Sequence, residues 1–354
     1  MGSHPLTKVR VIGSGLIGTS IALGLVQKGV MVQMVDADLN AQALATDLVG
    51  GVEIIEPELV IFALPTPLLP LVIGREFELN PNSTFMDVGS VKAEVLQHIE
   101  AISGLATKFL PTHPMAGREL GGASAARADL FQGRSWVLTP DAATDPAAKS
   151  LVLQLISMLG AVAIELSAAD HDSAVARVSH LPQIVASLMA KQLIGAAPEW
   201  MELAGPGLRD TTRIAASDEG LWKEIIYANR SEISQLLIQL ETDLKLMIQS
   251  LAEPAAIAAL LAAGRTGRAL IPGKHGGVAR EYTYLPIVID DKPGQLAAIF
   301  NECAVMNVNV EDLSIEHSPG QLSALITLAL SEGDAGKLAD HLSSIGWNVH
   351  PIRN

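Results

Sequence analysis

The sequence has one cysteine, few aromatic residues and no hydrophobic run long enough to cross a membrane. The single cysteine, Cys303, excludes an intramolecular disulfide and a multi-cysteine zinc site, and it favours a reducing, cytoplasmic location. Lys191 interrupts the apolar stretch 184–197 and Gly264 ends the stretch 255–263, so neither reaches the ~20 residues of a transmembrane helix. Residues 1–4 resemble a vector-derived tag and no signal peptide follows them. We therefore expect no membrane partner and no metal site.

Positive charge is also scarce: the sequence has 24 lysines and arginines but 38 acidic residues, which gives a net charge of −14. An acidic surface repels the phosphates of nucleic acids and of anionic membranes, so we expect no nucleic-acid partner. An anionic substrate would need a local group of cations. A composition of 49% hydrophobic but 4% aromatic residues is typical of a helix-rich enzyme, and 354 residues predict two or three domains.

The N-terminal segment predicts a dinucleotide-binding unit. Residues 8–12 have the pattern of a strand, residues 13–18 carry the spacing G-x-G-x-x-G, and residues 19–27 have helical spacing. The glycines allow a tight turn, close approach of a pyrophosphate and close helix–strand packing, and the helix N-terminus attracts the anion. The next strand, 30–35, ends in Asp36, whose carboxylate would bind a ribose and repel a 2′-phosphate. The pattern predicts NAD as the cofactor.

Three polar residues are expected to surround one crevice, because ligands bind at the carboxyl ends of the strands in open α/β sheets. Thr66 and Ser90 follow two apolar strands, and His113 lies between a strand and a glycine turn. An imidazole there can accept a proton as an alcohol is oxidised, although a loop histidine can also merely bind the backbone. Ser90 either orients His113 or the nicotinamide, or only caps the next helix, on which Lys92 is expected to be solvated. The predicted cofactor contacts are Gly13, Gly15, Leu16, Ile17, Gly18, Asp36, Thr66 and Ser90.

From residue 167 to residue 263, strand patterns give way to Ala/Leu/Ile stretches with helical spacing, which predicts an all-α domain. Residues 178–196 are apolar almost all round, which suits helices buried against a second subunit, so we expect an intertwined homodimer. Arg209 and Arg213 lie four residues apart and, on one helix, would share a face that can bind a dianion. The alternative is that both arginines form surface ion pairs with neighbouring carboxylates.

The C-terminal part predicts a small separate domain. Residues 264–281 are rich in glycine and lack periodicity, which is typical of a linker. Beyond them the patterns predict a strand, a helix, two strands around a turn at 318–320, a helix and a strand, and this β-α-β-β-α-β order is ferredoxin-like. The predicted domains are a Rossmann-type α/β domain over 5–166, a helical substrate and dimerisation domain over 167–263, the linker over 264–281, and a regulatory domain over 282–354.

Taken together, five motifs in this order resemble the prephenate/arogenate dehydrogenases of tyrosine biosynthesis. They are Gly13-x-Gly15-x-x-Gly18, Asp87-Val88-Gly89-Ser90-Val91-Lys92, His113-Pro114-Met115-Ala116-Gly117, Val178-Ser179-His180-Leu181-Pro182 and Arg209-Asp210-Thr211-Thr212-Arg213-Ile214-Ala215. Segments 291–296 and 307–310 resemble an ACT domain, a module that senses amino acids. The resemblance implies NAD-dependent oxidative decarboxylation of prephenate to 4-hydroxyphenylpyruvate, with feedback inhibition by an aromatic amino acid, tyrosine being the expected effector.

The same resemblance implies roles for individual residues. His113 would accept the proton of the ring hydroxyl with Ser90 orienting it, and Arg213 would pair with the ring carboxylate. The other expected substrate residues are Arg209 and His180 at the side-chain end, Glu119 as a gate, and Trp222 packed near the site.

Three alternatives remain at this level. Arogenate, which has an amino group in place of the keto group, could be the substrate. The β-hydroxyacid dehydrogenases share the domain plan but use a catalytic lysine, and Lys191 lacks the asparagine motif around that lysine. A catalytically silent sensor of NAD and amino acids is the third, since a fold does not guarantee an activity.

Overall fold

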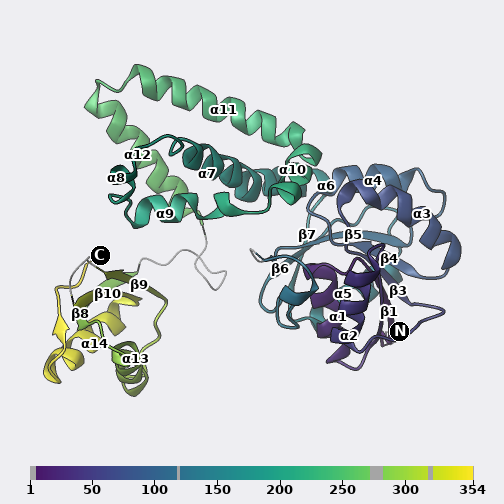
Figure 1. Ribbon diagram of the computed structural model, residues 1–354, viewed down its shortest axis with the longest axis horizontal. Helices are drawn as coiled ribbons and strands as arrows, with labels where there is room; N and C mark the ends of the chain where they lie inside the picture. Colours follow the sequence, from purple (N-terminus) through teal and green to yellow (C-terminus); the bar gives the residue numbers. More distant parts are fainter. Residues whose placement is uncertain (1–4, 118–119, 272–281, 318–321, 354) are drawn as a thin grey trace. The chain divides into compact units, whose positions relative to one another are not determined.

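The computed structural model describes residues 5–117, 120–271, 282–317 and 322–353, and the chain divides into the units Met1–Leu244 and Lys245–Asn354. A seven-stranded sheet with the order β2-β1-β3-β4-β5-β6-β7 is the centre of the first unit (Figure 1). Strands β1 to β5 are parallel, whereas β6 runs antiparallel to β5 and β7 runs parallel to β6. The strands are β1 (Lys8–Ile12), β2 (Met31–Val35), β3 (Leu59–Phe62), β4 (Thr84–Asp87), β5 (Phe109–Pro114), β6 (Ser135–Leu138) and β7 (Val162–Glu165).

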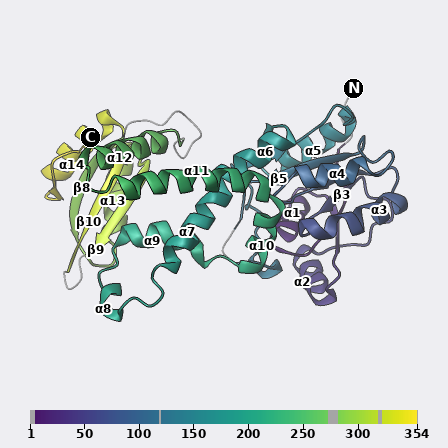
Figure 2. The same cartoon turned by 90° about the horizontal axis from the view of Figure 1, so that it is seen from above.

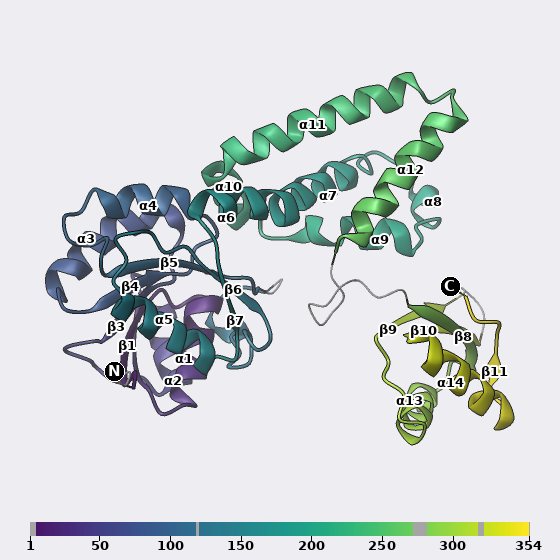
Figure 3. The same cartoon turned by 180° about the vertical axis from the view of Figure 1, so that it is seen from behind.

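Helices cover both faces of this sheet, as Figures 1 and 3 show from opposite sides. One face carries α1 (Leu16–Val26), α2 (Leu39–Val49) and α5 (Pro146–Met158), and the other carries α3 (Leu69–Leu79) and α4 (Ala93–Glu100). Each face has its own buried hydrophobic cluster. The central strand β3 is buried at every residue, which is why its sequence is continuously apolar instead of alternating. Short 3-10 turns lie at η1 (Thr66–Leu68) and η2 (Ala123–Ala125).

Beyond β7, the described residues 166–271 contain helices and no strand, in agreement with the helical pattern. Helix α6 (Ala168–Val175) passes through a π-helical turn (Ala176–His180) into α7 (Leu181–Lys191). Pro182 lacks an N–H and its ring clashes with the carbonyl four residues earlier, so a widened turn accommodates it. The remaining elements of this part are α8 (Pro198–Met201), α9 (Pro206–Thr212), η4 (Arg213–Ala216), α10 (Glu219–Ala228), α11 (Arg230–Gln249) and α12 (Pro254–Ala269).

The linker predicted at 264–281 begins too early in the sequence, because α12 continues to Ala269. Glycines at 264 and 267 do not end this helix, since its alanine-rich turns favour helix strongly enough to carry two of them. Residues 272–281 lie outside the described part of the chain. Among the described residues, no helix is long and apolar enough to cross a membrane.

The C-terminal domain follows the predicted element order. Its strands are β8 (Thr283–Asp290), β9 (Asp312–His317), β10 (Ser323–Leu330) and β11 (Asn348–Val349), and its helices are α13 (Gln295–Val305) and α14 (Glu332–Ser344). The strands form an antiparallel sheet in the order β11-β8-β10-β9, and Figure 2 shows β8, β10 and β9 side by side. Residues of both helices, Cys303 among them, join the sheet in one hydrophobic cluster. The turn predicted at 318–320 lies outside the described residues.

Candidate active site

The glycine turn between β1 and α1 has the shape that a dinucleotide needs. Gly13 has a positive φ of 113°, and a Cβ atom there would lie 2.2 Å from the carbonyl oxygen of Ala63. A Cβ atom at Gly18 would lie 2.0 Å from the carbonyl oxygen of Gly13, so these two glycines allow the turn and the helix to pack closely. At Gly15, in contrast, a Cβ atom would meet nothing within 4 Å. The space in front of Gly15 is therefore open on the side where a pyrophosphate would approach.

The N-terminus of α1 adds a favourable electrostatic environment for that anion. Its N-cap residue, Gly15, provides no side-chain acceptor and no acidic residue lies in the first turn, where Leu16 and Ile17 are found. The backbone N–H groups and the helix dipole are thus available to a phosphate. The buried hydroxyl Oγ of Ser14 has no hydrogen-bond partner within the described residues. These features fit a dinucleotide.

Asp36 ends β2 next to this turn, as predicted. Its Oδ2 atom accepts a hydrogen bond of 2.6 Å from the backbone N–H of Ser14, which fixes the carboxylate beside the glycines. The nearby Asp38 is exposed and caps α2 by accepting from the N–H groups of Asn40 and Ala41. The position of Asp36 suits a ribose-binding carboxylate.

The predicted crevice residues lie at or just beyond the ends of three adjacent strands. Thr66 opens η1 four residues after the end of β3, and a Cβ atom at Gly89 would lie 3.5 Å from Thr66 Oγ1, so the segments after β3 and β4 adjoin. His113 lies within β5 itself and not in the loop that follows, and β5 pairs with β4. Thr66, Ser90 and His113 therefore belong to three neighbouring strand ends.

Ser90 does not fill either of its two expected structural roles directly. The N-cap residue of α4 is Lys92, so the expectation of Ser90 as the helix cap is wrong. Among the described residues, no hydrogen bond joins Ser90 to His113, whose Nδ1 atom is bonded elsewhere. A contact of Ser90 with the nicotinamide stays a prediction.

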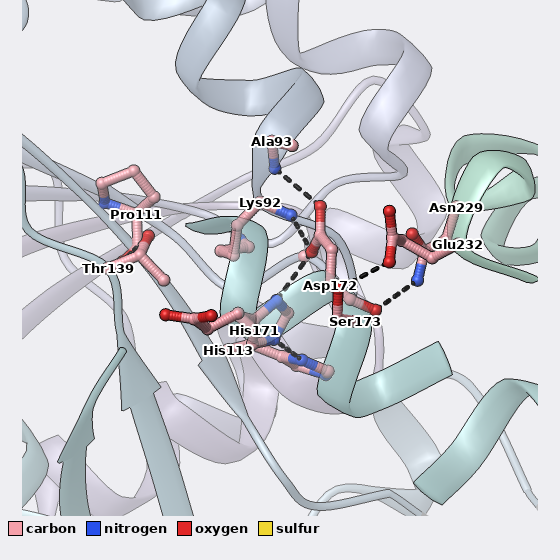
Figure 4. Close-up of polar contacts among 12 residues, drawn as sticks. Lys92, Ala93, Pro111, His113, Thr139, His171, Asp172, Ser173, Asn229 and Glu232 are labelled. Atoms are coloured by element: carbon pink, nitrogen blue, oxygen red, sulfur yellow. Dashed lines mark hydrogen bonds and ion pairs between the residues drawn. The ribbon is translucent and has the colours of Figure 1, made fainter. Parts of the chain in front are cut away.

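A chain of side chains leads from His113 into the helical domain (Figure 4). His113 Nδ1 lies 2.9 Å from Nε2 of His171, and His171 Nδ1 lies 2.7 Å from Oδ1 of Asp172. The two imidazole rings meet edge to face with centroids 5.1 Å apart. His171 and Asp172 come from α6, so a helix of the second domain positions the histidine of the first.

Asp172 itself is held by the start of α4. Its Oδ1 and Oδ2 atoms each accept a hydrogen bond of 2.8 Å, from the backbone N–H groups of Lys92 and Ala93 respectively. The carboxylate thereby caps a helix from another domain. Its backbone carbonyl accepts a hydrogen bond of 2.8 Å from Asn229 Nδ2, which also lies 3.1 Å from Nδ1 of His180.

Lys92 lies fully buried, which corrects the expectation of a solvated side chain. Its ammonium group forms an ion pair with Asp87 and donates a hydrogen bond of 2.7 Å to the carbonyl of Thr112, the residue before His113. Asp87 in turn accepts hydrogen bonds from the backbone N–H groups of Gly89 and Thr112. Lys92 thus ties the end of β4 to the strand that carries His113.

These surroundings keep two histidines neutral. Burial lowers the pKa of His113 well below its usual value, and the nearby His171, Lys92 and His180 lower it further. Burial also lowers the pKa of His180 to about 4, although Asp172 opposes the shift. A neutral imidazole can accept a proton at neutral pH, so His113 can act as a general base.

The predicted anion-binding residues lie on a separate segment. Arg209 belongs to α9 and Arg213 opens the 3-10 turn η4, and both are exposed. Helix α9 ends at Thr212, so the two arginines do not share one continuous helix. Gln183 of α7 donates a hydrogen bond of 2.9 Å to the carbonyl of Ile214, which ties η4 to the helix that follows His180.

Two other predicted substrate residues differ in what the structure reveals. Trp222 of α10 meets the ring of His180 edge to face at a centroid distance of 6.1 Å, so it does pack beside a site residue. Glu119 lies outside the described residues. No group of three or more potential metal ligands was found in the described part of the chain.

The residues that sequence reasoning missed are the ones that support the two histidines: His171, Asp172 and Lys92. The adjacent His171-Asp172 pair at the start of the helical domain was the available signal. The sequence alone does not show what this dipeptide contacts. Its role depends on the packing of α6 against α4 and β5, which joins segments about 60 to 80 residues apart.

The sheet carries a dinucleotide-binding turn after β1 and a neutral histidine on β5, and a helix of the second domain holds that histidine in place. These features define a nicotinamide-dependent dehydrogenase. Comparison with protein families agrees with this class. Residues 13–165 match the nucleotide-binding domain of prephenate dehydrogenase, and residues 167–259 match the prephenate dehydrogenase dimerisation domain. The chain belongs to the prephenate dehydrogenase family.

Individual relatives support this assignment over most of their length. A probable prephenate dehydrogenase of Streptomyces niveus is 29% identical over 353 residues, which span 95% of this chain and 98% of the relative. The structure of prephenate dehydrogenase from A. aeolicus, in complex with hydroxyphenyl propionate and NAD+, matches with a TM-score of 0.68 and 27% identity, covering 76% of this chain and all of that one. Arogenate dehydrogenase from Synechocystis matches with a TM-score of 0.64 and 25% identity, covering 75% of this chain and all of that one.

Proposed function

We propose that the protein oxidises prephenate with NAD and releases carbon dioxide, giving 4-hydroxyphenylpyruvate. The observation that carries this proposal is a neutral His113 on β5, in the same sheet as the strand β1 that leads into the dinucleotide turn, in a chain of the prephenate dehydrogenase family. The relatives with that name and the neighbour that binds NAD+ support it.

The reaction needs a base, an oxidant and an anchored substrate. His113 takes the proton of the ring hydroxyl through Nε2, the ring nitrogen that has no partner among the described residues. The glycine turn, the N-terminus of α1 and Asp36 would hold NAD, which would serve as the oxidant for the hydride of the hydroxyl-bearing carbon. Loss of the ring carboxylate as carbon dioxide makes the ring aromatic, and its electron pair leaves a phenolate that recovers the proton from His113. The gain of aromaticity drives decarboxylation, so the protein mainly contributes position and proton transfer.

Arg213 is the proposed partner of the ring carboxylate, with Arg209 and His180 toward the side chain of the substrate. An acidic protein needs such cations to hold a dianion, and guanidinium groups bind carboxylates in a bidentate geometry. Trp222 packs beside His180. The gating role of Glu119 and a contact of Ser90 with the cofactor belong to the same proposal.

The direct test is NADH formation, followed by absorbance, with purified prephenate and NAD. We expect turnover that depends on prephenate and yields 4-hydroxyphenylpyruvate. NADP in place of NAD should support much less turnover, because Asp36 faces the ribose position. Absence of NADH at every prephenate concentration would refute the proposal, and absence of NADH with arogenate as well would revive the sensor alternative.

Arogenate is the second candidate substrate. The structural likeness to arogenate dehydrogenase from Synechocystis favours it, and the ring chemistry at His113 is identical for the two compounds. The two compounds differ only at the side-chain end, where prephenate has a keto group and arogenate has an amino group. The ratio of kcat/KM for the two purified compounds decides between them.

The helical domain supports a homodimer. Within it, large apolar side chains such as Ile194, Trp200 and Leu203 are more than half exposed, and this region matches a dimerisation domain. Covering these side chains against a second copy would remove apolar area from water. Light scattering after gel filtration should give twice the mass of the 37.2 kDa chain.

The C-terminal domain is proposed to be an ACT domain with a ferredoxin-like fold that binds tyrosine. The support is its β-α-β-β-α-β order together with the segments 291–296 and 307–310. Tyrosine should lower the rate and raise the melting temperature if it binds here and is coupled to the active site. The single cysteine, Cys303, is buried in this domain and supports a cytoplasmic location.

A further inference from the structure

Asp172 is linked to both histidines of the active site, His113 and His180, through one intervening side chain on each of two routes. Its carboxylate reaches His113 through His171, and its backbone carbonyl reaches His180 through Asn229. Figure 4 shows Asp172 between α4 and the side chains of His171 and Asn229. The carboxylate and the backbone carbonyl of Asp172 can accept hydrogen bonds but cannot donate them. This fixes which ring nitrogen of each histidine carries its hydrogen.

Along the first route, the ionised carboxylate of Asp172 can only accept. His171 must therefore carry a hydrogen on Nδ1 to make its 2.7 Å contact, and a neutral His171 then has a lone pair on Nε2. That lone pair accepts from His113 Nδ1 at 2.9 Å, so His113 carries its hydrogen on Nδ1. A neutral His113 consequently has a bare Nε2, which is the form that a general base needs.

Along the second route, the carbonyl of Asp172 can only accept. The side-chain amide of Asn229 must turn its NH₂ group toward that carbonyl, and the same NH₂ group then faces Nδ1 of His180. His180 Nδ1 therefore accepts, and a neutral His180 carries its hydrogen on Nε2. This ring nitrogen is a donor, suited to an oxygen of an anionic substrate.

We propose that Asp172 and Asn229 are positioning residues that hold His113 and His180 in opposite tautomers, one as a proton acceptor and the other as a hydrogen-bond donor. The catalytic meaning of this arrangement rests on the proposed function. The tautomers themselves do not depend on which substrate is turned over. The α4 N-terminus stabilises the arrangement, because it holds the carboxylate of Asp172 through Lys92 and Ala93.

Asp172→Asn is the decisive variant, because it keeps the shape of the side chain but can present an NH₂ group to His171. An NH₂ group there moves the hydrogen of His171 to Nε2 and that of His113 to Nε2, which removes the base. Asn229→Asp makes the corresponding change for His180, since a carboxylate favours a hydrogen on His180 Nδ1. Asp170→Asn, an exposed carboxylate on the same helix, is the matched control.

The measurement is the ¹⁵N spectrum of the full-length protein labelled at histidine, recorded near pH 7 without substrate. Signals are assigned through the variants His113→Asn and His180→Asn, and ring-nitrogen shifts report each tautomer. In the unsubstituted protein we expect His113 protonated on Nδ1 and His180 protonated on Nε2. Asp172→Asn should move the His113 hydrogen to Nε2 and lower kcat by ~10²–10⁴-fold, with KM for NAD unchanged. Asn229→Asp should alter His180 alone, and Asp170→Asn neither.

A spectrum in which His113 carries its hydrogen on Nε2, or in which His180 carries it on Nδ1, overturns the proposal even if neither Asp172→Asn nor Asn229→Asp folds. So does an Asp172→Asn protein that loses activity while its His113 tautomer is unchanged, because that result indicates a purely structural role. If the tautomers are as expected but prephenate yields no NADH, the proposed function fails and the assignment of the tautomers stands.

Discussion

The two ends of the proposed substrate site are built in different ways. The base end, formed by His113, His171, Asp172 and Lys92, is held by side chains from β5, α6 and α4 that bond one another. The arginine end, formed by Arg209 and Arg213, is exposed on α9 and η4. The difference teaches that a general base is held in a fixed geometry by buried contacts, whereas the cations expected to bind a substrate carboxylate are placed where an incoming anion can reach them.

The largest expected effect is on the base. His113→Asn keeps a polar side chain but cannot accept the proton, so kcat should fall by ~10²–10⁴-fold, with little change in KM for NAD. His98→Asn, a partly exposed histidine on α4, is the matched control and should remain active. A His113→Asn protein with near-normal kcat would show that the base end does not perform the proton transfer.

The buried ion pair of the base end should dominate its stability. Lys92→Met leaves the carboxylate of Asp87 buried without a counter-charge, and removing one partner of such a pair typically costs about 3–5 kcal/mol. Urea denaturation measures the loss. The double variant Lys92→Met/Asp87→Asn should recover part of it, because no buried charge is left over. Equal stability of the single variant and the unsubstituted protein would contradict the structural role of Lys92.

A smaller effect, on binding, is expected at the arginine end. Arg213→Ala should raise KM for prephenate by the loss of a charged hydrogen bond, about 1.5–3 kcal/mol or ~10–150-fold. Arg213→Lys should retain part of the affinity. Steady-state kinetics with each substrate varied in turn test this, and a matching rise in KM for NAD would argue against a carboxylate contact.

The smallest effect is the dependence of stability on pH. The unfolded chain takes up a proton on His180 near pH 6.5, whereas the folded chain does so only near its pKa of about 4. Stability should therefore fall as the pH is lowered from 6.5 toward 4, by at most ~1.4 kcal/mol per pH unit for this group. His113 acts in the same direction, since its pKa is also lowered. Urea midpoints between pH 7 and 4.5 measure the slope, and His180→Asn should reduce it.

Local patterns were enough to predict most of the sheet and its cofactor turn. Strand 8–12 is confirmed to the residue, because a short apolar run before G-x-G-x-x-G has few alternatives. Lys92 could not be predicted, since the sequence does not show that Asp87 and the carbonyl of Thr112 enclose its side chain. The same holds for Asp172, whose carboxylate accepts from the backbone N–H groups of two residues that lie 79 and 80 positions earlier in the sequence. Motifs identify reacting groups well, whereas supporting contacts depend on tertiary packing.

The π-helical turn at Ala176–His180 changes the direction in which the side chains beyond it leave the helix. His171 and His180 are nine residues apart, and nine residues of regular α-helix correspond to 2.5 turns at ~3.6 residues per turn, which would direct the two side chains to opposite sides. A wider turn rotates each of its residues by less, so the second histidine falls short of that half turn. One irregular turn thus lets a single run of helix direct His171 toward His113 of the sheet domain and His180 toward Asn229. Deleting one residue from this turn would keep every functional side chain and still misalign the site.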